Sequence, residues 1–170
     1  MRKLLLILWF SLMSTILAVP AFAVDQQEFD RILQLKMTDL TEEASVLLEK
    51  KYPEEDWDAF RFPKFVFSSD PVETGYRIAV KESETLRKIP CYCFCDAMGH
   101  KNLLHCFFKE GKVGGEYDDH AVGCNICYGQ AMLAFLWKNA GAGDEKILKG
   151  MEQKFEGLLK QRGKNAHAGH

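Results

Sequence analysis

All six cysteines of this 170-residue chain lie between residues 91 and 127. They form a Cys-x-Cys-x-Cys run, a single cysteine and a Cys-x-x-Cys pair: Cys91, Cys93, Cys95, Cys106, Cys124 and Cys127. Cysteines that only fill a hydrophobic core would be scattered along the chain. The clustering therefore predicts one thiol-rich region that serves as a metal site, a redox group or a set of disulfides.

The N-terminus predicts an export signal. Arg2 and Lys3 precede an uncharged, mainly apolar stretch over residues 4–19, and Ala21-Phe22-Ala23 matches the small-x-small cleavage pattern. We expect cleavage after Ala23 and a periplasmic or secreted protein. A retained membrane helix is the alternative interpretation of the apolar stretch. No cysteine follows the cleavage site to accept a lipid, so no membrane anchor is expected once residues 1–23 are removed.

What remains predicts one domain over residues 24–162, followed by a polar tail over residues 163–170. The chain has 22 Lys and Arg against 24 Asp and Glu, and the predicted signal removes two more positive charges. A mildly acidic surface of this kind gives no electrostatic reason to expect nucleic acid or an anionic membrane as a partner.

Apolar spacing predicts helices in the N-terminal half. Through residues 25–52 apolar side chains recur every three or four positions, which indicates one long helix or two abutting helices, with Asp39 or Thr41 capping the second. Residues 53–69 are rich in aromatic side chains but have no partner strand. We expect them to form an irregular segment laid over the core.

Helix signals continue after this segment. Asp70 is predicted to cap a helix whose first turn holds Pro71 and Glu73, and Ser83 opens a short turn that ends before Pro90. Further helices are predicted over residues 101–108, 119–139 and 144–161, with a glycine-rich excursion over residues 110–116. The fold class is all-α: a small bundle of four or five helices around one core, with a cysteine-rich loop in segment 90–128.

The first cysteine run is predicted to be extended or turned rather than helical. Side chains two residues apart then point to the same side, whereas on a helix they point in nearly opposite directions. Cys91, Cys93 and Cys95 would share one face, and Tyr92 and Phe94 would face the core. Thiols that share a face can chelate a soft metal ion.

The second cysteine pair is predicted to lie on a helix. With a helix start near Asp119, His120, Cys124 and Cys127 would lie on one stripe, and the helix N-terminus would lower the pKa of the thiols. Tyr128 follows the pair where c-type haem attachment needs histidine. No βαβ unit precedes the pair, as a thioredoxin-like protein would require.

The histidines of this region differ as ligand candidates. His120, four residues before Cys124, is the best candidate, and His100 is left open. His105 lies between Leu104 and Cys106 and is expected to belong to packing or to the surface.

Several separate segments agree in spacing with one known family. They are Pro90-Cys91-Tyr92-Cys93-Phe94-Cys95, then Gly99-His100-Lys101-Asn102-Leu103-Leu104-His105-Cys106-Phe107, and His120 with Cys124-Asn125-Ile126-Cys127. From Ile89 to about Phe155 the chain resembles the bacterial exported proteins named for their Pro-Cys-Tyr-Cys-Gly-Cys motif. The resemblance implies an exported protein whose cysteines are expected to bind metal, without a defined biochemical activity to carry over. Phe94 replaces the glycine of the motif, and the lipid-accepting cysteine of many family members is missing.

Three functions are open at this point. The first is an exported soft-metal-binding protein for Cu(I) or Zn(II), with ligands Cys91, Cys93, Cys95, Cys106, His120, Cys124 and Cys127. The second is a non-catalytic periplasmic binding module stabilised by disulfides, and the third is a thiol–disulfide oxidoreductase that uses Cys124 and Cys127. The first function, and disulfides that join the two cysteine clusters, require these clusters to converge in space.

Overall fold

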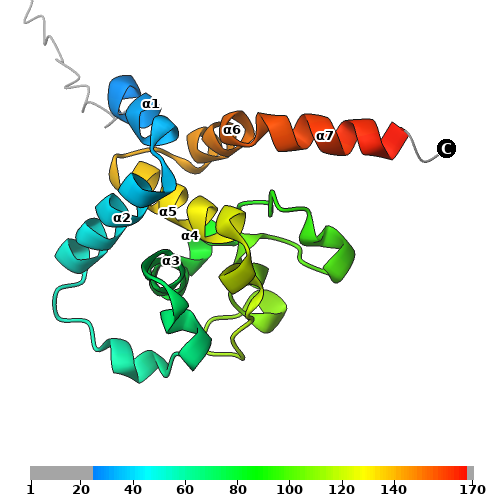
Figure 1. Ribbon diagram of the computed structural model, residues 1–170. Coiled ribbons are helices and arrows are strands. Elements are labelled where there is room, and N and C mark those ends of the chain that lie inside the picture. The colour runs from blue at the N-terminus through cyan, green and yellow to red at the C-terminus, as the bar shows by residue number, and fades with distance from the viewer. Residues whose placement is uncertain (1–24, 168–170) are drawn as a thin grey trace, which may run out of the picture.

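Helix α5 (Asn125–Asn139) lies at the centre of the structure, and most of the other helices pack around it (Figure 1). The computed structural model describes residues 25–167. Every residue from Gly129 to Trp137 is buried, so α5 is enclosed on all its faces rather than along one stripe. A helix of this kind belongs in the middle of a core.

Two abutting helices cover one side of α5: α1 (Gln26–Gln34) and α2 (Met37–Lys51). The two-helix form of segment 25–52 is thus confirmed, but the second helix begins at Met37, so the predicted caps Asp39 and Thr41 are wrong. The break comes at Leu35, which leaves helical backbone with φ −57° and ψ 136°. Thr41 lies inside α2 and donates its hydroxyl to the carbonyl of Met37 at 2.8 Å.

Residues 53–69 form no strand. They make two 3-10 turns, Trp57–Phe60 and Lys64–Ser68, and the ring of Phe62 between them packs on Phe60 and on Phe67. Phe62 also packs on Tyr117, with ring centroids 5.5 Å apart, and the Tyr117 hydroxyl donates to the carbonyl of Phe60. The prediction of an irregular segment over the core is confirmed.

Helix α3 (Asp70–Lys81) begins where predicted, but its cap differs. Ser69 is the capping residue, without a side-chain capping bond, and Asp70 lies inside the first turn. Glu73 pairs with Arg77 one turn later instead of reaching back to close a capping box. The short helix α4 (Ser83–Leu86) follows as predicted.

The chain between α4 and α5 is built from turns. The helix predicted over residues 101–108 is reduced to a 3-10 turn at Leu103–Cys106, because Phe108 has extended backbone with φ −137° and ψ 128°. Phe108 then pairs with Tyr117 in an antiparallel bridge that closes the glycine-rich excursion. The helix predicted from Asp119 is divided into a 3-10 turn at His120–Gly123 and helix α5.

The C-terminal helix is interrupted at Phe155. Helix α6 (Asp144–Lys154) packs on the core, and α7 (Glu156–His167) extends away from it (Figure 1). Met151 is buried as predicted, but Leu159 is 37% exposed because α7 leaves the core. The helix continues to His167, past its predicted end at Gln161 and into the segment predicted as a polar tail.

The all-α prediction is confirmed, with seven α-helices in residues 25–167 rather than four or five. The larger number comes from the breaks at Leu35 and Phe155 and from the short α4. Within the same residues no helix is both long enough and apolar enough to span a bilayer. The predicted signal over residues 1–23 lies outside the described part of the chain.

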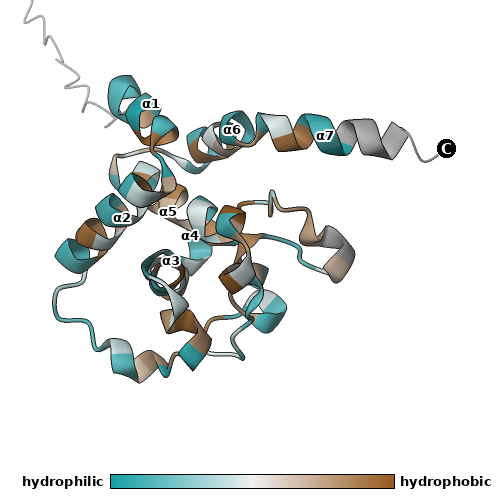
Figure 2. Ribbon diagram, viewed as in Figure 1, coloured by the Kyte–Doolittle hydropathy of each residue, from teal (hydrophilic) through white to brown (hydrophobic). Residues whose placement is uncertain are grey.

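Tight aromatic packing joins α1, α5 and α6. The rings of Phe29 and Trp137 stack 4.8 Å apart, and the Trp137 indole donates to the carbonyl of Phe29. Gly150 of α6 faces both rings, and a Cβ added there would lie 2.7 Å from each. Helices α1, α2 and α6 each carry hydrophilic and hydrophobic bands, as expected of helices that cover a core with one face (Figure 2).

One buried carboxylate ties three helical elements together. Glu82, 6% exposed, accepts from Lys51 of α2 at 2.7 Å and from Lys138 of α5 at 2.8 Å. Tyr52 also donates its hydroxyl to Glu82 at 3.1 Å. Burial alone would raise the pKa of Glu82, but hydrogen bonds from Lys138 and Lys51 outweigh it and hold the pKa below its ordinary value.

We predict that Glu82→Gln lowers the free energy of unfolding by about 2–3 kcal/mol, because it leaves two lysines without their shared partner. The contribution of Glu82 is present above the ordinary carboxyl pKa of 4.5 and is lost as pH falls through the lower folded-state value. The difference between wild type and variant should therefore shrink in acid. Urea unfolding at several pH values measures it.

The matched control is Glu84→Gln. Glu84 is 78% exposed and lies 3.5 Å from Arg87, so its loss should cost less than about 0.5 kcal/mol. Equal effects of the two substitutions would contradict the role given to Glu82.

Candidate metal centre

The first three cysteines lie in a loop over residues 90–102 whose ends are joined by a backbone hydrogen bond. The amide of Leu103 donates to the carbonyl of Ile89 at 2.8 Å. Inside the loop, Phe94 donates its amide to the carbonyl of Cys91 and so closes a turn. The turn places the three sulfurs together: Cys91 and Cys93 Sγ are 2.9 Å apart, and Cys93 and Cys95 Sγ are 2.6 Å apart.

The two aromatic residues of this run behave differently. Tyr92 is buried and stacks on Phe155 with ring centroids 5.5 Å apart. Phe94 is only half-buried and lies against the Arg162 guanidinium at 4.7 Å. The prediction that both rings face the core is therefore correct for Tyr92 and wrong for Phe94. The reason is the backbone of Phe94, whose φ of +61° turns its side chain away from that of Tyr92.

Cys106 enters from the 3-10 turn that follows the loop. Asn102 caps this turn by accepting from the amide of Leu104 at 3.1 Å. The Cys106 Sγ lies 3.2 Å from Cys91 Sγ and 3.5 Å from the Nδ1 atom of His100. Cys106 is fully buried.

His120 is held by a chain of hydrogen bonds that begins in α3. The Tyr76 hydroxyl donates to the carbonyl of Asp118, and the Asp118 carboxylate accepts from the amide of His120 at 2.8 Å. The Asp118 amide in turn donates to the carbonyl of Phe107. His120 Nε2 comes to lie 2.8 Å from Cys95 Sγ and 3.9 Å from Cys93 Sγ.

Cys124 and Cys127 lie at the start of α5. Cys124 is the capping residue, with φ −128° and ψ 98°, and Cys127 is in the first turn and fully buried. The predicted single helical stripe of His120, Cys124 and Cys127 is therefore wrong. The clusters nevertheless converge, since Cys127 Sγ lies 3.4 Å from Cys93 Sγ and 4.0 Å from Cys91 Sγ.

Taken together, eight side chains form one continuous cluster of possible ligand atoms. It consists of three overlapping sets, and within each set the ligand atoms all lie within 4.8 Å of one another. The sets are Cys91, Cys93, Cys106 and Cys127; Cys93, His120, Cys124 and Cys127; and Cys95, His100 and His120. All seven residues predicted as metal ligands are brought together here. Whether they bind a metal stays a prediction at this point.

His100 and His105 differ in their position relative to the cluster. His100 joins the cluster although it was not placed among the predicted ligands, and its position after Gly99 in a cysteine-rich loop was the available signal. His105 stays outside the three sets. Its Nδ1 lies 3.0 Å from the side-chain oxygen of Asn102, and its ring packs against Gly111.

Neighbouring thiols and the helix start together favour a thiolate at Cys124. Hydrogen bonds from the side chains of Cys127 and Cys93, together with the backbone amides of Cys127 and Ile126, lower the pKa of Cys124 to about 3. The predicted lowering at a helix N-terminus thus holds for Cys124, where the backbone amides are the smaller cause, but not for Cys127, whose pKa is raised.

The pKa values of four other thiols are shifted, and in opposite directions. Hydrogen bonds from Cys106, Cys127 and Cys93 hold the pKa of Cys91 far below its usual range, whereas the neighbouring sulfurs raise the pKa of Cys93 and Cys127 far above it. Burial raises the pKa of Cys95 to about 11. Cys91 and Cys124 therefore favour the thiolate, whereas Cys93, Cys95 and Cys127 favour the protonated thiol, and a cation would be needed for these three to ionise as well.

The shortest sulfur separation, 2.6 Å between Cys93 and Cys95, is longer than a disulfide bond and shorter than the distance between two thiolates on one ion. A disulfide requires about 2.05 Å between sulfurs, and all six cysteines are free here. Two thiolates on one tetrahedral ion with metal–sulfur distances of about 2.3 Å lie about 3.8 Å apart. In the first set, Cys91 Sγ lies 2.9 Å from Cys93 Sγ, 3.2 Å from Cys106 Sγ and 4.0 Å from Cys127 Sγ. Cys93 and Cys127 Sγ are 3.4 Å apart.

A buried amide adjoins the cluster. Gln130 is fully buried one turn after Cys127, and its side-chain oxygen accepts from the amide of Tyr92 at 3.4 Å. This bond holds the Cys91–Cys93 backbone against α5. The side-chain nitrogen of Gln130 is buried and has no partner among the described residues.

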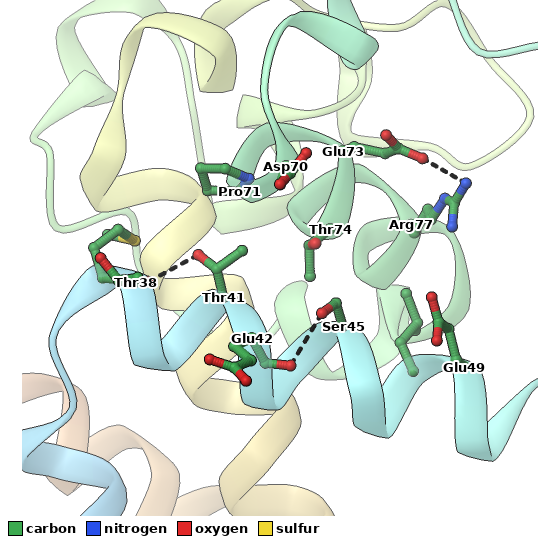
Figure 3. A pocket seen from close by; sticks show the side chains of 12 residues that line it. Thr38, Thr41, Glu42, Ser45, Glu49, Asp70, Pro71, Glu73, Thr74 and Arg77 are labelled. Carbon is green, nitrogen blue, oxygen red and sulfur yellow. Dashed lines mark hydrogen bonds and ion pairs between the residues drawn. The ribbon is translucent and has the colours of Figure 1, made fainter.

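A separate hollow of ≈ 570 Å³ lies between α2 and α3 (Figure 3). Part of its polar lining is paired within the protein: Thr41 and Ser45 donate their hydroxyls to α2 carbonyls, and Glu73 pairs with Arg77. No cysteine or histidine lines it, so it does not share the chemistry of the thiol cluster.

Comparison with known proteins gives a match to one family. A family model described as "Protein of unknown function with PCYCGC motif" matches residues 17–162. The match also covers the N-terminal helices, which lie outside the segment that the sequence resemblance had covered. No curated protein and no solved structure matched the chain.

The backbone at Phe94 explains why the motif has glycine at this position. A φ of +61° costs a non-glycine residue about 1–2 kcal/mol, whereas glycine adopts it freely. We predict that Phe94→Gly has a free energy of unfolding about 1 kcal/mol higher than that of Phe94→Ala, which loses the same ring but keeps the strain. Thermal or urea unfolding of both variants measures the difference, and an alanine variant of equal or greater stability would contradict it.

Proposed function

Because the chain belongs to the family of PCYCGC-motif proteins, in which a cysteine run defines the motif, we propose that it is an exported protein that binds soft metal ions, Cu(I) or Zn(II), through this cluster. One observation carries the proposal. Six thiols and two imidazoles from four separate segments meet in one partly buried cluster of overlapping sets. Metal binding requires the thiolate form, and burying several thiolates together is unfavourable unless a cation neutralises them.

The ligand chemistry selects the class of metal. Among the described residues, none of the three sets includes a carboxylate. Thiolate and imidazole prefer Cu(I) and Zn(II), whereas hard ions such as Mg²⁺ and Ca²⁺ require oxygen ligands. Each of the two sets that contain Cys93 and Cys127 supplies the four ligands of a tetrahedral site.

The two alternatives use the same sulfurs and compete with metal. Each disulfide formed in an oxidising compartment removes two ligands, so the metal has to bind before oxidation. In a redox role, the half-buried Cys124 with its lowered pKa would be the attacking sulfur and the buried Cys127 the resolving one, and a metal ion bound to both would block that reaction.

The chain, purified anaerobically after export, should contain Zn or Cu and release it on acidification or chelation. We predict that His120→Asn weakens Zn(II) or Cu(I) binding at least about tenfold, because it removes one ligand of the second set. Competition with a chelator of known affinity measures the change.

The matched control is His105→Asn, in the same region but outside all three sets. Its metal affinity should stay within about twofold of wild type. Purified protein with no metal and no free thiols would overturn metal binding in favour of the disulfide-stabilised module.

The export part of the proposal has its own test. The Ala21-Phe22-Ala23 pattern predicts that the mature chain starts at Val24 without a lipid adduct. Intact-mass spectrometry of the exported protein should show the loss of residues 1–23. As a control, Ala23→Tyr should block processing at this site, because the cleavage position requires a small side chain. A mature protein that retains these residues, or that carries a lipid, would contradict the prediction.

A further inference from the structure

We propose that the cluster holds two divalent thiophilic ions that share the thiolates of Cys93 and Cys127. One ion takes Cys91 and Cys106 as its other ligands, and the second takes Cys124 and His120. This inference rests on the proposed function and adds the number of ions and the way the ligands are divided between them.

The division follows from the overlap of the two sets. Each set has four ligand atoms within 4.8 Å of one another, and the two sets have only Cys93 and Cys127 in common. Two tetrahedra that share an edge have six corners, and the two sets together contain six residues. The cluster thus supplies complete coordination for two tetrahedral ions, with no position left for an outside ligand.

The shared pair lies where bridging ligands belong. Cys93 and Cys127 Sγ are 3.4 Å apart, close to the edge of about 3.8 Å expected for thiolates on one tetrahedral ion. Cys91 Sγ approaches both bridging sulfurs, at 2.9 Å from Cys93 and 4.0 Å from Cys127. Cys106 lies beside Cys91 at 3.2 Å, so the first ion has its two terminal ligands on one side of the shared edge.

Separate backbone elements supply the terminal ligands of the second ion. Cys124 is the capping residue of α5, and His120 lies in the preceding 3-10 turn, where Asp118 accepts from its backbone amide. His120 Nε2 lies 3.9 Å from Cys93 Sγ, on the side of the second set. Neither residue belongs to the set of Cys91 and Cys106.

Charge decides between one ion and two. The two sets hold five cysteines, and one divalent ion would leave either a large negative charge or several protonated thiols that cannot ligate. A second divalent ion brings the charge of five thiolates close to neutral, whereas two monovalent ions leave it strongly negative. Buried, uncompensated charge is costly, so two divalent ions fit this cluster best.

The test begins with the reduced, metal-free mature chain under anaerobic conditions. Titration with Zn(II) followed by native mass spectrometry should give two ions per chain. Loading with ¹¹³Cd(II) should give two cadmium resonances, and the Hβ protons of Cys93 and Cys127 should each correlate with both. One ion per chain, two ions without a shared cysteine, or binding of Cu(I) but not of Zn(II) would overturn the shared centre and leave soft-metal binding standing. A chain that binds none of these metals would overturn both proposals.

Three variants separate the roles of the ligands. Cys124→Ser should reduce Zn(II) from two ions to one, because the first set is intact, and Cys93→Ser should remove tight binding of both ions. His105→Asn is the matched control, in the same region but outside all three sets, and should retain two ions. Loss of an ion in His105→Asn, or two ions in Cys93→Ser, would overturn the assignment. The ¹¹³Cd correlations of the wild-type chain decide the question even if a variant fails to fold.

Discussion

Enclosure of helix α5 is the constraint on which the structure depends. From Gly129 to Trp137 the helix has no face that tolerates water, so other elements must cover it on every side. Helices α1, α2, α3 and α6 provide most of that cover. The first turn of α5 carries Cys127 into the same interior. The packing around α5 therefore also places the 90–102 loop, with its three cysteines, over the N-terminal end of this helix.

The cluster itself is assembled by turns that the core holds in place. The 90–102 loop is closed by the backbone bond between Ile89 and Leu103, and Gln130 binds it to α5. The turn that carries His120 is held by two hydrogen bonds, one from the Tyr76 hydroxyl to the Asp118 carbonyl and one from the His120 amide to the Asp118 carboxylate. Functional side chains are often found on loops held by a rigid scaffold, because turns can bring residues from several directions to one point. Four segments meet here, and a single helix face could not bring all eight side chains together.

Crowding of the thiols links protonation to metal binding. Hydrogen bonds among the sulfurs favour thiolates at Cys91 and Cys124 and keep protons on Cys93 and Cys127. Cys93 and Cys127 are also the two residues common to both four-ligand sets. Ionising them becomes favourable only when cations are present, so metal binding and the final packing of this region are expected to depend on each other. The strained backbone of Phe94, where the motif has glycine, lies in the same turn.

The sequence by itself determined the helical class and the identity of the thiol residues, and it predicted that residues 119–139 contain a helix. Apolar spacing reflects local backbone geometry, so helical structure over residues 25–52 and in α3 could be predicted without knowledge of its neighbours. The alternation of Cys91, Cys93 and Cys95 likewise predicted that their sulfurs share one side. Tertiary structure decided what depends on distant contacts. Burial of Phe107 and Phe108 replaced the predicted 101–108 helix by a turn, and the extended backbone at Cys124 separated His120 from α5. The position of His100 beside Cys106, and the sharing of Cys93 and Cys127 between two ligand sets, arise only when four segments fold together, and no local pattern encodes that meeting.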